Sequence, residues 1–265
     1  MTVLPAPRRR SSLARAVAGA RPILTRGLPA ALLAIAVAAQ AQTPVEAARA
    51  LVRRYHQDVT GLDRARELLE SALAKDPQVE TMVMLSYVQF LWADVRAGSA
   101  DERLAAYERG RQVGERAVEL APRSAEAHLW YAINTARWGQ TKGVMRSLFL
   151  LPTVKREIDT ILTLDPRSAR GHSLAGNVYM EVPRLAGGDR AKAEAHFKTG
   201  LEIDPRFTVL RVDLARLYIG DGRYAEARRE LARVLEERAP RVVPDWTVKD
   251  VPRARALLDS IRDRR

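Results

Sequence analysis

Histidine side chains are the first candidates for chemistry in this sequence. The four histidines lie at positions 56, 128, 172 and 196, and none has the His-Glu-x-x-His spacing of a zinc site. His128 and His172 each follow a proline by six residues, so equivalent positions in a repeated structure could form a metal-binding or pH-sensing pair. No further ligand is apparent. Helix packing is therefore the favoured interpretation, and no metal is predicted.

Ser173 is the second candidate, because Gly-His-Ser-Leu-Ala at 171–175 resembles the nucleophile elbow of α/β-hydrolases with alanine in the last place. That motif exposes its serine only at a sharp turn between a strand and a helix. Here the preceding Asp-Pro-Arg-Ser at 165–168 starts a helix instead. The chain also has no cysteine, which excludes disulfides, thiolate metal sites and a cysteine nucleophile. We therefore predict no catalytic site, no enzymatic activity and no cofactor.

The elements that carry these residues are repeated along the chain. A helix-like run followed by Asp-Pro or Ala-Pro occurs five times, with spacings of 45, 44, 39 and 35 residues between the prolines. The prolines are Pro77, Pro122, Pro166, Pro205 and Pro240. Small and large apolar residues precede each proline at offsets that lie on one helix face, as in Ala193, Phe197 and Gly200. Small residues at such positions predict closely packed helix pairs.

These residues resemble the tetratricopeptide repeat (TPR) family, whose period is about 34 residues. The resemblance is clearest in Thr208 to Ala239, with the turn Gly220 to Tyr224, and in Ala169 to Pro205. It implies an all-α fold: a TPR-like helical-hairpin solenoid of about five repeats within residues 42–240. Residues 241–265 are predicted to form a linker and a C-terminal capping helix, with Asp250 as the N-cap of that helix.

Three repeats carry insertions of 11, 10 and 5 residues on the same edge, which predict long inserted loops or helix extensions. The first contains Ser99 to Glu102, a capping box that would open a long helix. The second, residues 143–152, is strongly apolar and ends in proline. The third, residues 181–188, has the Pro and Gly content of a turn.

Residues 1–41 differ from the rest, since they contain six arginines and no acidic residue, with an apolar run from Leu28 to Ala39. This run is too short to span a bilayer, and Ala39-Gln40-Ala41 has the form of a cleavage site. We predict a signal peptide cleaved near Ala41 and a periplasmic or secreted bacterial protein. An organelle transit peptide is the alternative.

The net charge of the chain is +12, of which the first 41 residues contribute +6. No dense basic patch interleaved with aromatics occurs, so no nucleic-acid partner is predicted. We also predict from the sequence that this is not a transmembrane protein.

The TPR resemblance implies that the first helix of each repeat lines a concave groove that binds a protein partner. The implied groove residues are Met84, Val88, Trp92, Leu129, Ile133, Arg137, Ser173, Asn177 and Arg216. This face is apolar with a polar end, so either the segment 144–151 fills it or it holds an apolar ligand or partner helix. The first interpretation is favoured, which leaves Asn177 and Arg216 as the better binding candidates.

Two functions follow from this architecture. The leading one is an exported, non-catalytic adaptor for protein–protein interaction. The alternative is an accessory protein that binds a small apolar ligand, because the insertions, Gly187-Gly188-Asp189 and the C-terminal Ala254-x-x-Leu257-Leu258 resemble the TPR subunits associated with TRAP transporters. Residues 125–240 also resemble regulator of microtubule dynamics proteins in layout, without motifs that would transfer function.

Overall fold

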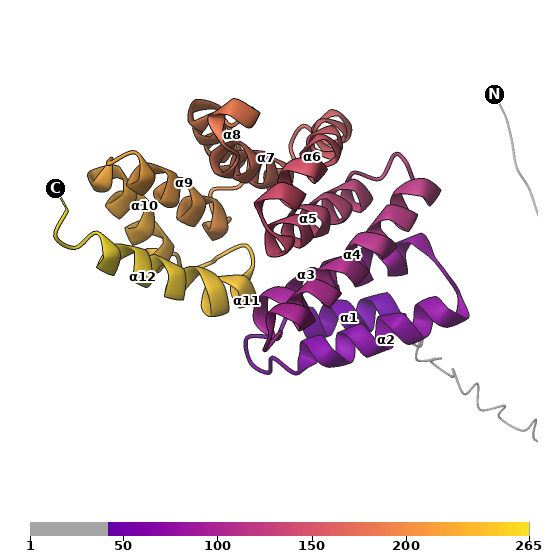
Figure 1. Ribbon diagram of the computed structural model, residues 1–265. Coiled ribbons are helices and arrows are strands. Elements are labelled where there is room, and N and C mark those ends of the chain that lie inside the picture. The colour runs from indigo at the N-terminus through magenta and orange to yellow at the C-terminus, as the bar shows by residue number, and fades with distance from the viewer. Residues whose placement is uncertain (1–41, 265) are drawn as a thin grey trace, which may run out of the picture. The chain divides into compact units, whose positions relative to one another are not determined.

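Helical hairpins follow one another along the computed structural model, which describes residues 42–264 (Figure 1). The predicted signal peptide lies outside these residues. The five hairpins are α1 (Pro44–Val52) with α2 (Gly61–Lys75), α3 (Val79–Val95) with α4 (Ala100–Leu120), α5 (Ala125–Lys142) with α6 (Val144–Leu164), α7 (Ala169–Glu181) with α8 (Arg190–Ile203), and α9 (Thr208–Gly220) with α10 (Tyr224–Glu236). No strand occurs in this part of the chain. The predicted all-α, TPR-like solenoid is confirmed.

The helices begin where short polar side chains can cap them. Ser124 and Ser168 each stand two residues after a repeat proline, and each accepts a hydrogen bond from the backbone N–H three residues ahead. The predicted capping box is present at Ser99 and Glu102, each of which accepts a hydrogen bond from the backbone N–H of the other. The same local signal therefore starts both short and extended helices.

Close helix contact within a hairpin depends on small residues, as α7 and α8 illustrate. A Cβ added to Gly176 would lie 2.4 Å from the ring of Phe197, which is fully buried. The glycine thus makes room for an aromatic side chain that fills the hairpin interior.

The first two insertions lengthen helices, and only the third forms a turn of irregular chain with one short 3-10 helix (Arg184–Ala186). Residues 144–151 form the first two turns of α6. Val144, Met145 and Phe149 in this segment are 70%, 81% and 73% exposed. The interpretation that residues 144–151 fill the groove is wrong, because Val144, Met145 and Phe149 point to the outside and the half-buried Leu150 packs against Gly139 of α5.

Residues 243–260, here called the C-terminal strap, are helical throughout: α11 (Val243–Asp245), one π-helical stretch (η2, Trp246–Asp250) and α12 (Val251–Ser260). The prediction that Asp250 caps the last helix is wrong, because its side chain makes no capping hydrogen bond and the chain is already helical before it. Its backbone is helical, at φ −76° and ψ −42°, and its carboxylate accepts a hydrogen bond of 2.6 Å from the Thr208 hydroxyl. The strap begins beside the N-terminal repeats, where α11 lies near α3, and α12 then runs back along the last hairpin (Figure 1). No helix in residues 42–264 is long and apolar enough to cross a membrane.

Candidate functional site

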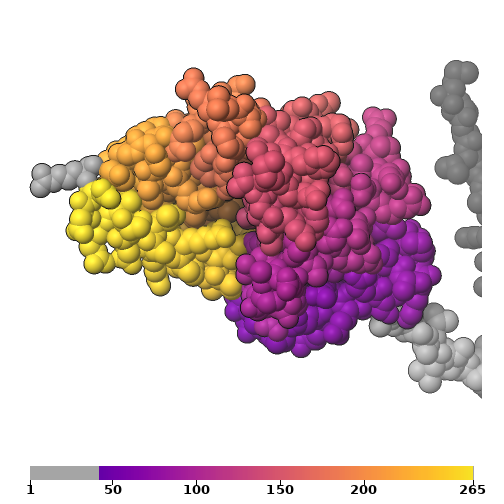
Figure 2. All heavy atoms as spheres, viewed as in Figure 1, coloured from indigo at the N-terminus to yellow at the C-terminus, as the bar shows by residue number. Residues whose placement is uncertain are grey.

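A pocket of about 520 Å³ lies on the inner face of the solenoid, between the first helices of three repeats (α5, α7 and α9) and the C-terminal strap. Phe90 of α3 adds to its wall. In the space-filling view a hollow opens between the strap and the middle repeats (Figure 2). The TPR groove is thus covered along one side by the chain's own C-terminal part.

The strap is fixed to the N-terminal repeats by two polar contacts across long stretches of sequence. The Tyr55 hydroxyl donates a hydrogen bond of 2.5 Å to Asp245, and the Lys249 ammonium lies 2.9 Å from the Asp94 carboxylate. Burial raises the pKa of Tyr55, as does the neighbouring Asp245 carboxylate, so the hydroxyl keeps its proton and donates. These contacts join residues 190 and 155 positions apart and hold the pocket closed on this side.

Asp94 stays ionised in this contact. Its burial raises the pKa, but the attraction of Lys249 and Arg137 and a hydrogen bond from Tyr107 outweigh burial and hold the pKa at about 2. Both partners are largely removed from water, since the side chains of Lys249 and Asp94 are 12% and 9% exposed. A charge pair this buried is costly to break at one end only.

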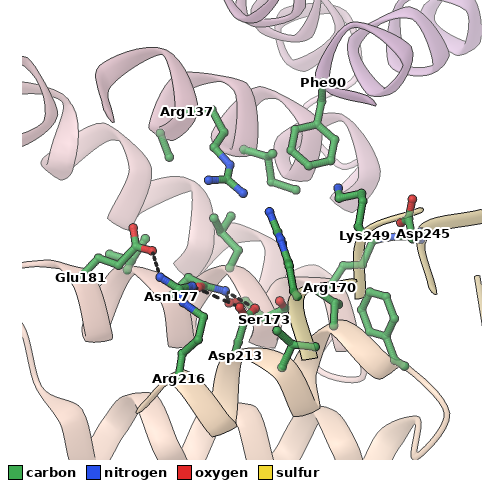
Figure 3. Close-up of a pocket in the computed structure, with 18 of the residues that line it drawn as sticks. Phe90, Arg137, Arg170, Ser173, Asn177, Glu181, Asp213, Arg216, Asp245 and Lys249 are labelled. Atoms are coloured by element: carbon green, nitrogen blue, oxygen red, sulfur yellow. Dashed lines mark hydrogen bonds and ion pairs between the residues drawn. The ribbon is translucent and has the colours of Figure 1, made fainter. Parts of the chain in front are cut away.

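Basic side chains converge in the middle of the pocket. Arg137 reaches in from α5 and Arg170 from α7, beside Lys249 and Phe90 of the opposite wall (Figure 3). Arg253 of the strap borders the same space and an adjoining polar hollow that also includes Arg137. Among residues 42–264, none of these three arginines forms an ion pair with a carboxylate, whereas Lys249 does.

Aromatic rings hold Arg170 in place. The guanidinium carbon of Arg170 lies 5.8 Å from the ring centre of Tyr87, 5.6 Å from that of Trp130 and 5.5 Å from that of Phe207. Tyr87 and Trp130 are themselves stacked, with centroids 4.2 Å apart. Contacts between a cation and ring faces orient the guanidinium without neutralising its charge.

The opposite end of the pocket is polar and internally paired. The Asn177 amide donates to Asp213 at 2.8 Å, and Arg216 lies 3.3 Å from Asp213 and 3.4 Å from Glu181 (Figure 3). Gln140 donates to the same Glu181 at 2.5 Å. The basic side chains that line the pocket outnumber its carboxylates, which are Glu181, Asp213 and Asp245, so the net charge of the lining is positive.

The structure brings together five of the nine predicted groove residues. Ile133, Arg137, Ser173, Asn177 and Arg216 line the pocket. The other four do not: Met84, Val88 and Leu129 are buried in the helix-packing core. Trp92 packs under Arg66 and donates from Nε1 to Asp63 at 2.5 Å.

Sequence reasoning missed Arg170, Val209 and the strap residues that line the pocket. Arg170 and Val209 each stand four residues after a repeat proline. This places them nearer the start of their helices than the predicted groove residues. The strap side chains at positions 245, 249, 253 and 257 recur every four residues. Residues at this spacing share one face of a helix. The spacing did not stand out from the sequence because residues 241–247 were predicted to form a linker, whereas the chain is helical from Val243 onward.

The candidate catalytic and metal residues do not assemble into such sites. Ser173 lies in mid-helix, in α7, so the strand-to-helix turn of a nucleophile elbow is missing. His172 pairs with His196, with 3.0 Å between their Nδ1 atoms, and not with His128. His128 is buried and contacts Glu157 at 2.5 Å and the Pro122 carbonyl at 3.0 Å. Within residues 42–264 no group of three or more His, Asp or Glu could hold a metal.

The hairpin stack and its lined groove define a TPR-type helical repeat protein. Among solved structures, the thermophilic TPR protein TTC0263 of Thermus thermophilus is similar, with a TM-score of 0.59 and 25% identity, covering 80% of this chain and 100% of that one.

The family described as Regulator of microtubule dynamics protein 1-3 matches residues 45–258, and the chain belongs to this family. Regulator of microtubule dynamics protein 3 of Rattus norvegicus is 27% identical over 54% of this chain, and that of Mus musculus 26% identical over 61%. These matches cover 35% and 38% of the two relatives, so the chain spans little more than a third of their length.

This family membership corrects one prediction. The periplasmic or secreted bacterial location is wrong, because the curated relatives are regulators of microtubule dynamics from rat and mouse. The association with TRAP transporters gains no support from these matches either. The coarser prediction of a TPR-type fold suited to protein–protein interaction agrees with them.

Proposed function

We propose that the chain is a non-catalytic adaptor that holds an extended segment of a protein partner in the strap-covered pocket. The observation that carries this proposal is the set of three arginines that make no ion-pair contact among the described residues, Arg137, Arg170 and Arg253, at an aromatic wall. The segment that fits such a pocket carries a carboxylate next to an apolar side chain.

The charge and shape of the pocket support this choice of partner. A guanidinium pairs with a carboxylate through two parallel hydrogen bonds, which are stronger than those between neutral groups. Arg170 is half-buried and already oriented by the rings around it, so little side-chain entropy is lost when a carboxylate binds. The half-buried ring of Phe90 in the pocket wall offers apolar surface for the neighbouring side chain.

The ligand alternative fits the pocket less well. A carrier of a small apolar molecule needs an enclosed cavity whose lining is predominantly hydrophobic. Among the apolar groove residues predicted from the sequence, which are Met84, Val88, Trp92, Leu129 and Ile133, only Ile133 reaches the pocket. The lining of the pocket is mostly apolar, but cationic groups stand at its centre, and an apolar molecule would leave them without partners.

The description of the relatives suggests where to look for the partner. The name Regulator of microtubule dynamics protein 3 refers to a process and does not specify a binding site. The match covers only about a third of that protein. We therefore propose that the partner belongs to the proteins that assemble or bind microtubules, and that this chain supplies the docking module.

Peptide selection tests the proposal directly. The full chain is panned against a random peptide phage library, and the peptides obtained are measured by fluorescence polarisation on wild type, Arg170→Met and, as a matched control, the outer-surface Arg229→Met. We expect peptides with Asp or Glu beside an aliphatic or aromatic residue, and about tenfold weaker binding to Arg170→Met only. Peptides without an acidic residue, or equal affinity for wild type and Arg170→Met, would refute the pocket as the binding site.

A further inference from the structure

The tip of the α5–α6 hairpin carries an apolar stripe that faces away from the rest of the molecule. The chain reverses at Gly143, whose φ of 109° is rarely adopted by residues with a side chain. The first turns of α6 then place Met145, Leu148, Phe149 and Pro152 three or four residues apart, hence on one face of the helix. Met145 and Phe149 are 81% and 73% exposed, Pro152 is exposed and Leu148 is half-buried, so the stripe, defined by these four residues, faces the outside.

The other face of this helix end is fixed to α5. A Cβ added to Gly139 would lie 3.3 Å from both the Ser147 backbone and the Leu150 side chain, so the two helices are in close contact here. Val154 and Ile158 continue the same inner face into the central core. Because the inner face is held, the helix cannot turn its apolar stripe inward.

The surroundings of the stripe are basic. Residues 127–156 contain no acidic residue, and four of their basic residues, Lys142, Arg146, Lys155 and Arg156, lie outside the pocket. Arg146 lies over the rings of Trp138 and Phe149, 5.6 Å from each centroid, and Lys142 lies 5.8 Å from the Trp138 centroid.

The nearby carboxylates are neutralised or buried. Glu108 of α4 forms an ion pair with Arg111 at 2.9 Å, and Glu181 of α7 forms one with Arg216 at 3.4 Å. Glu157 is 4% exposed and contacts His128. The charge that this end of the molecule presents around the stripe is therefore positive.

We propose that this stripe inserts into the boundary between headgroups and acyl chains of a membrane surface that contains anionic lipid. A bilayer interface accepts protruding apolar side chains and attracts the lysines and arginines beside them. A protein partner would more readily bind to a groove, and Met145 and Phe149 line neither the pocket nor the adjoining hollow. This surface acts independently of the pocket, so the two proposals stand or fall separately.

The absence of cysteine makes a site-specific test simple. Met145→Cys in the full chain is labelled with an environment-sensitive fluorophore, and Leu185→Cys, at an isolated and fully exposed leucine of another hairpin, is the matched control. Both are mixed with vesicles of phosphatidylcholine alone or with about 30% phosphatidylserine. We expect a blue shift and increased emission only for the Met145 label and only with phosphatidylserine, reduced when salt is raised to about 0.5 M.

Vesicle flotation with unlabelled variants completes the test. Met145→Ser/Phe149→Ser should bind phosphatidylserine vesicles at least about tenfold more weakly than wild type, while Leu185→Ser binds as wild type does. The altered side chains are exposed, so the helical circular dichroism of each variant should be unchanged. Flotation unaffected by the double substitution overturns the proposal. So does a blue shift without vesicles that grows with protein concentration, because it would assign the stripe to a second copy of the chain.

Discussion

Replacement of Lys249 by methionine tests whether the C-terminal strap is held in place by its buried charge pair. Methionine keeps the length and apolar stem of the lysine and removes only the charge that faces Asp94 at 2.9 Å. The pKa of Asp94, about 2 against an ordinary 3.8, corresponds to about 2 kcal/mol of stabilisation of its charged form. An uncompensated buried charge costs up to about 5 kcal/mol, but Arg137 and Tyr107 remain near Asp94.

We therefore expect Lys249→Met to lower the free energy of unfolding at pH 7 by about 2–4 kcal/mol, and Lys249→Arg, which keeps the charge, by less than about 1 kcal/mol. Urea unfolding followed by circular dichroism measures both values, and hydrogen exchange should show faster opening of residues 243–260 in Lys249→Met. The lowered pKa stabilises the fold above pH 4 and is lost as the pH falls toward 2, so the gap between wild type and Lys249→Met should narrow over that range. Equal free energies of unfolding for Lys249→Met and Lys249→Arg at pH 7 would show that the charge pair does not hold the strap.

Three further substitutions have defined outcomes. Burial raises the pKa of Asp250 to about 6, so the folded state binds this proton more tightly than the unfolded state and wild type loses stability as the pH rises from about 4 to above 6. The free energy of unfolding of Asp250→Asn, measured with urea, should therefore equal that of wild type at pH 4 and exceed it by up to about 3 kcal/mol at pH 8. A difference that stays constant with pH would show that the Asp250 carboxyl does not cause the loss of stability. His128→Ala leaves the buried Glu157 without its close partner and should cost about 3 kcal/mol, while the half-buried His172→Ala should cost less than half as much in thermal unfolding. Gly176→Ala places a methyl 2.4 Å from the Phe197 ring and should cost about 1–3 kcal/mol, with partial recovery in the double variant with Phe197→Leu; a neutral effect would show that the hairpin is looser than described.

The repeats and their packing could be predicted from sequence because they rest on local signals. Each repeat proline marks a boundary between helices, and the serines that follow at 124 and 168 cap the next helix. Gly176 and Phe197 combine small and large residues within one hairpin. Patterns of this kind involve neighbours in the chain, so one sequence contains them in full.

The pocket was predicted only in part because it depends on contacts between distant segments. Asn177 and Arg216 occupy repeat positions that the TPR resemblance assigns to the groove, so both could be predicted. Lys249 reaches the pocket through its contact with Asp94, which is 155 residues away in the sequence. The apolar segment 144–151 was predicted to fill the groove because apolar surface is usually buried against other apolar surface. The close fit of Ser147 and Leu150 on Gly139 instead turns Phe149 outward, and no sequence pattern reports that orientation.

The central claim is that an acidic side chain of a partner binds the arginines of the strap-covered pocket. A double-mutant cycle tests it most directly: the tightest selected peptide and its variant with the acidic residue changed to the corresponding amide are titrated against wild type and Arg170→Met by calorimetry. The account predicts that the two changes are strongly non-additive, with a coupling energy of at least about 1 kcal/mol. Additive losses within about 0.3 kcal/mol would show that the carboxylate does not contact Arg170, and would contradict the account.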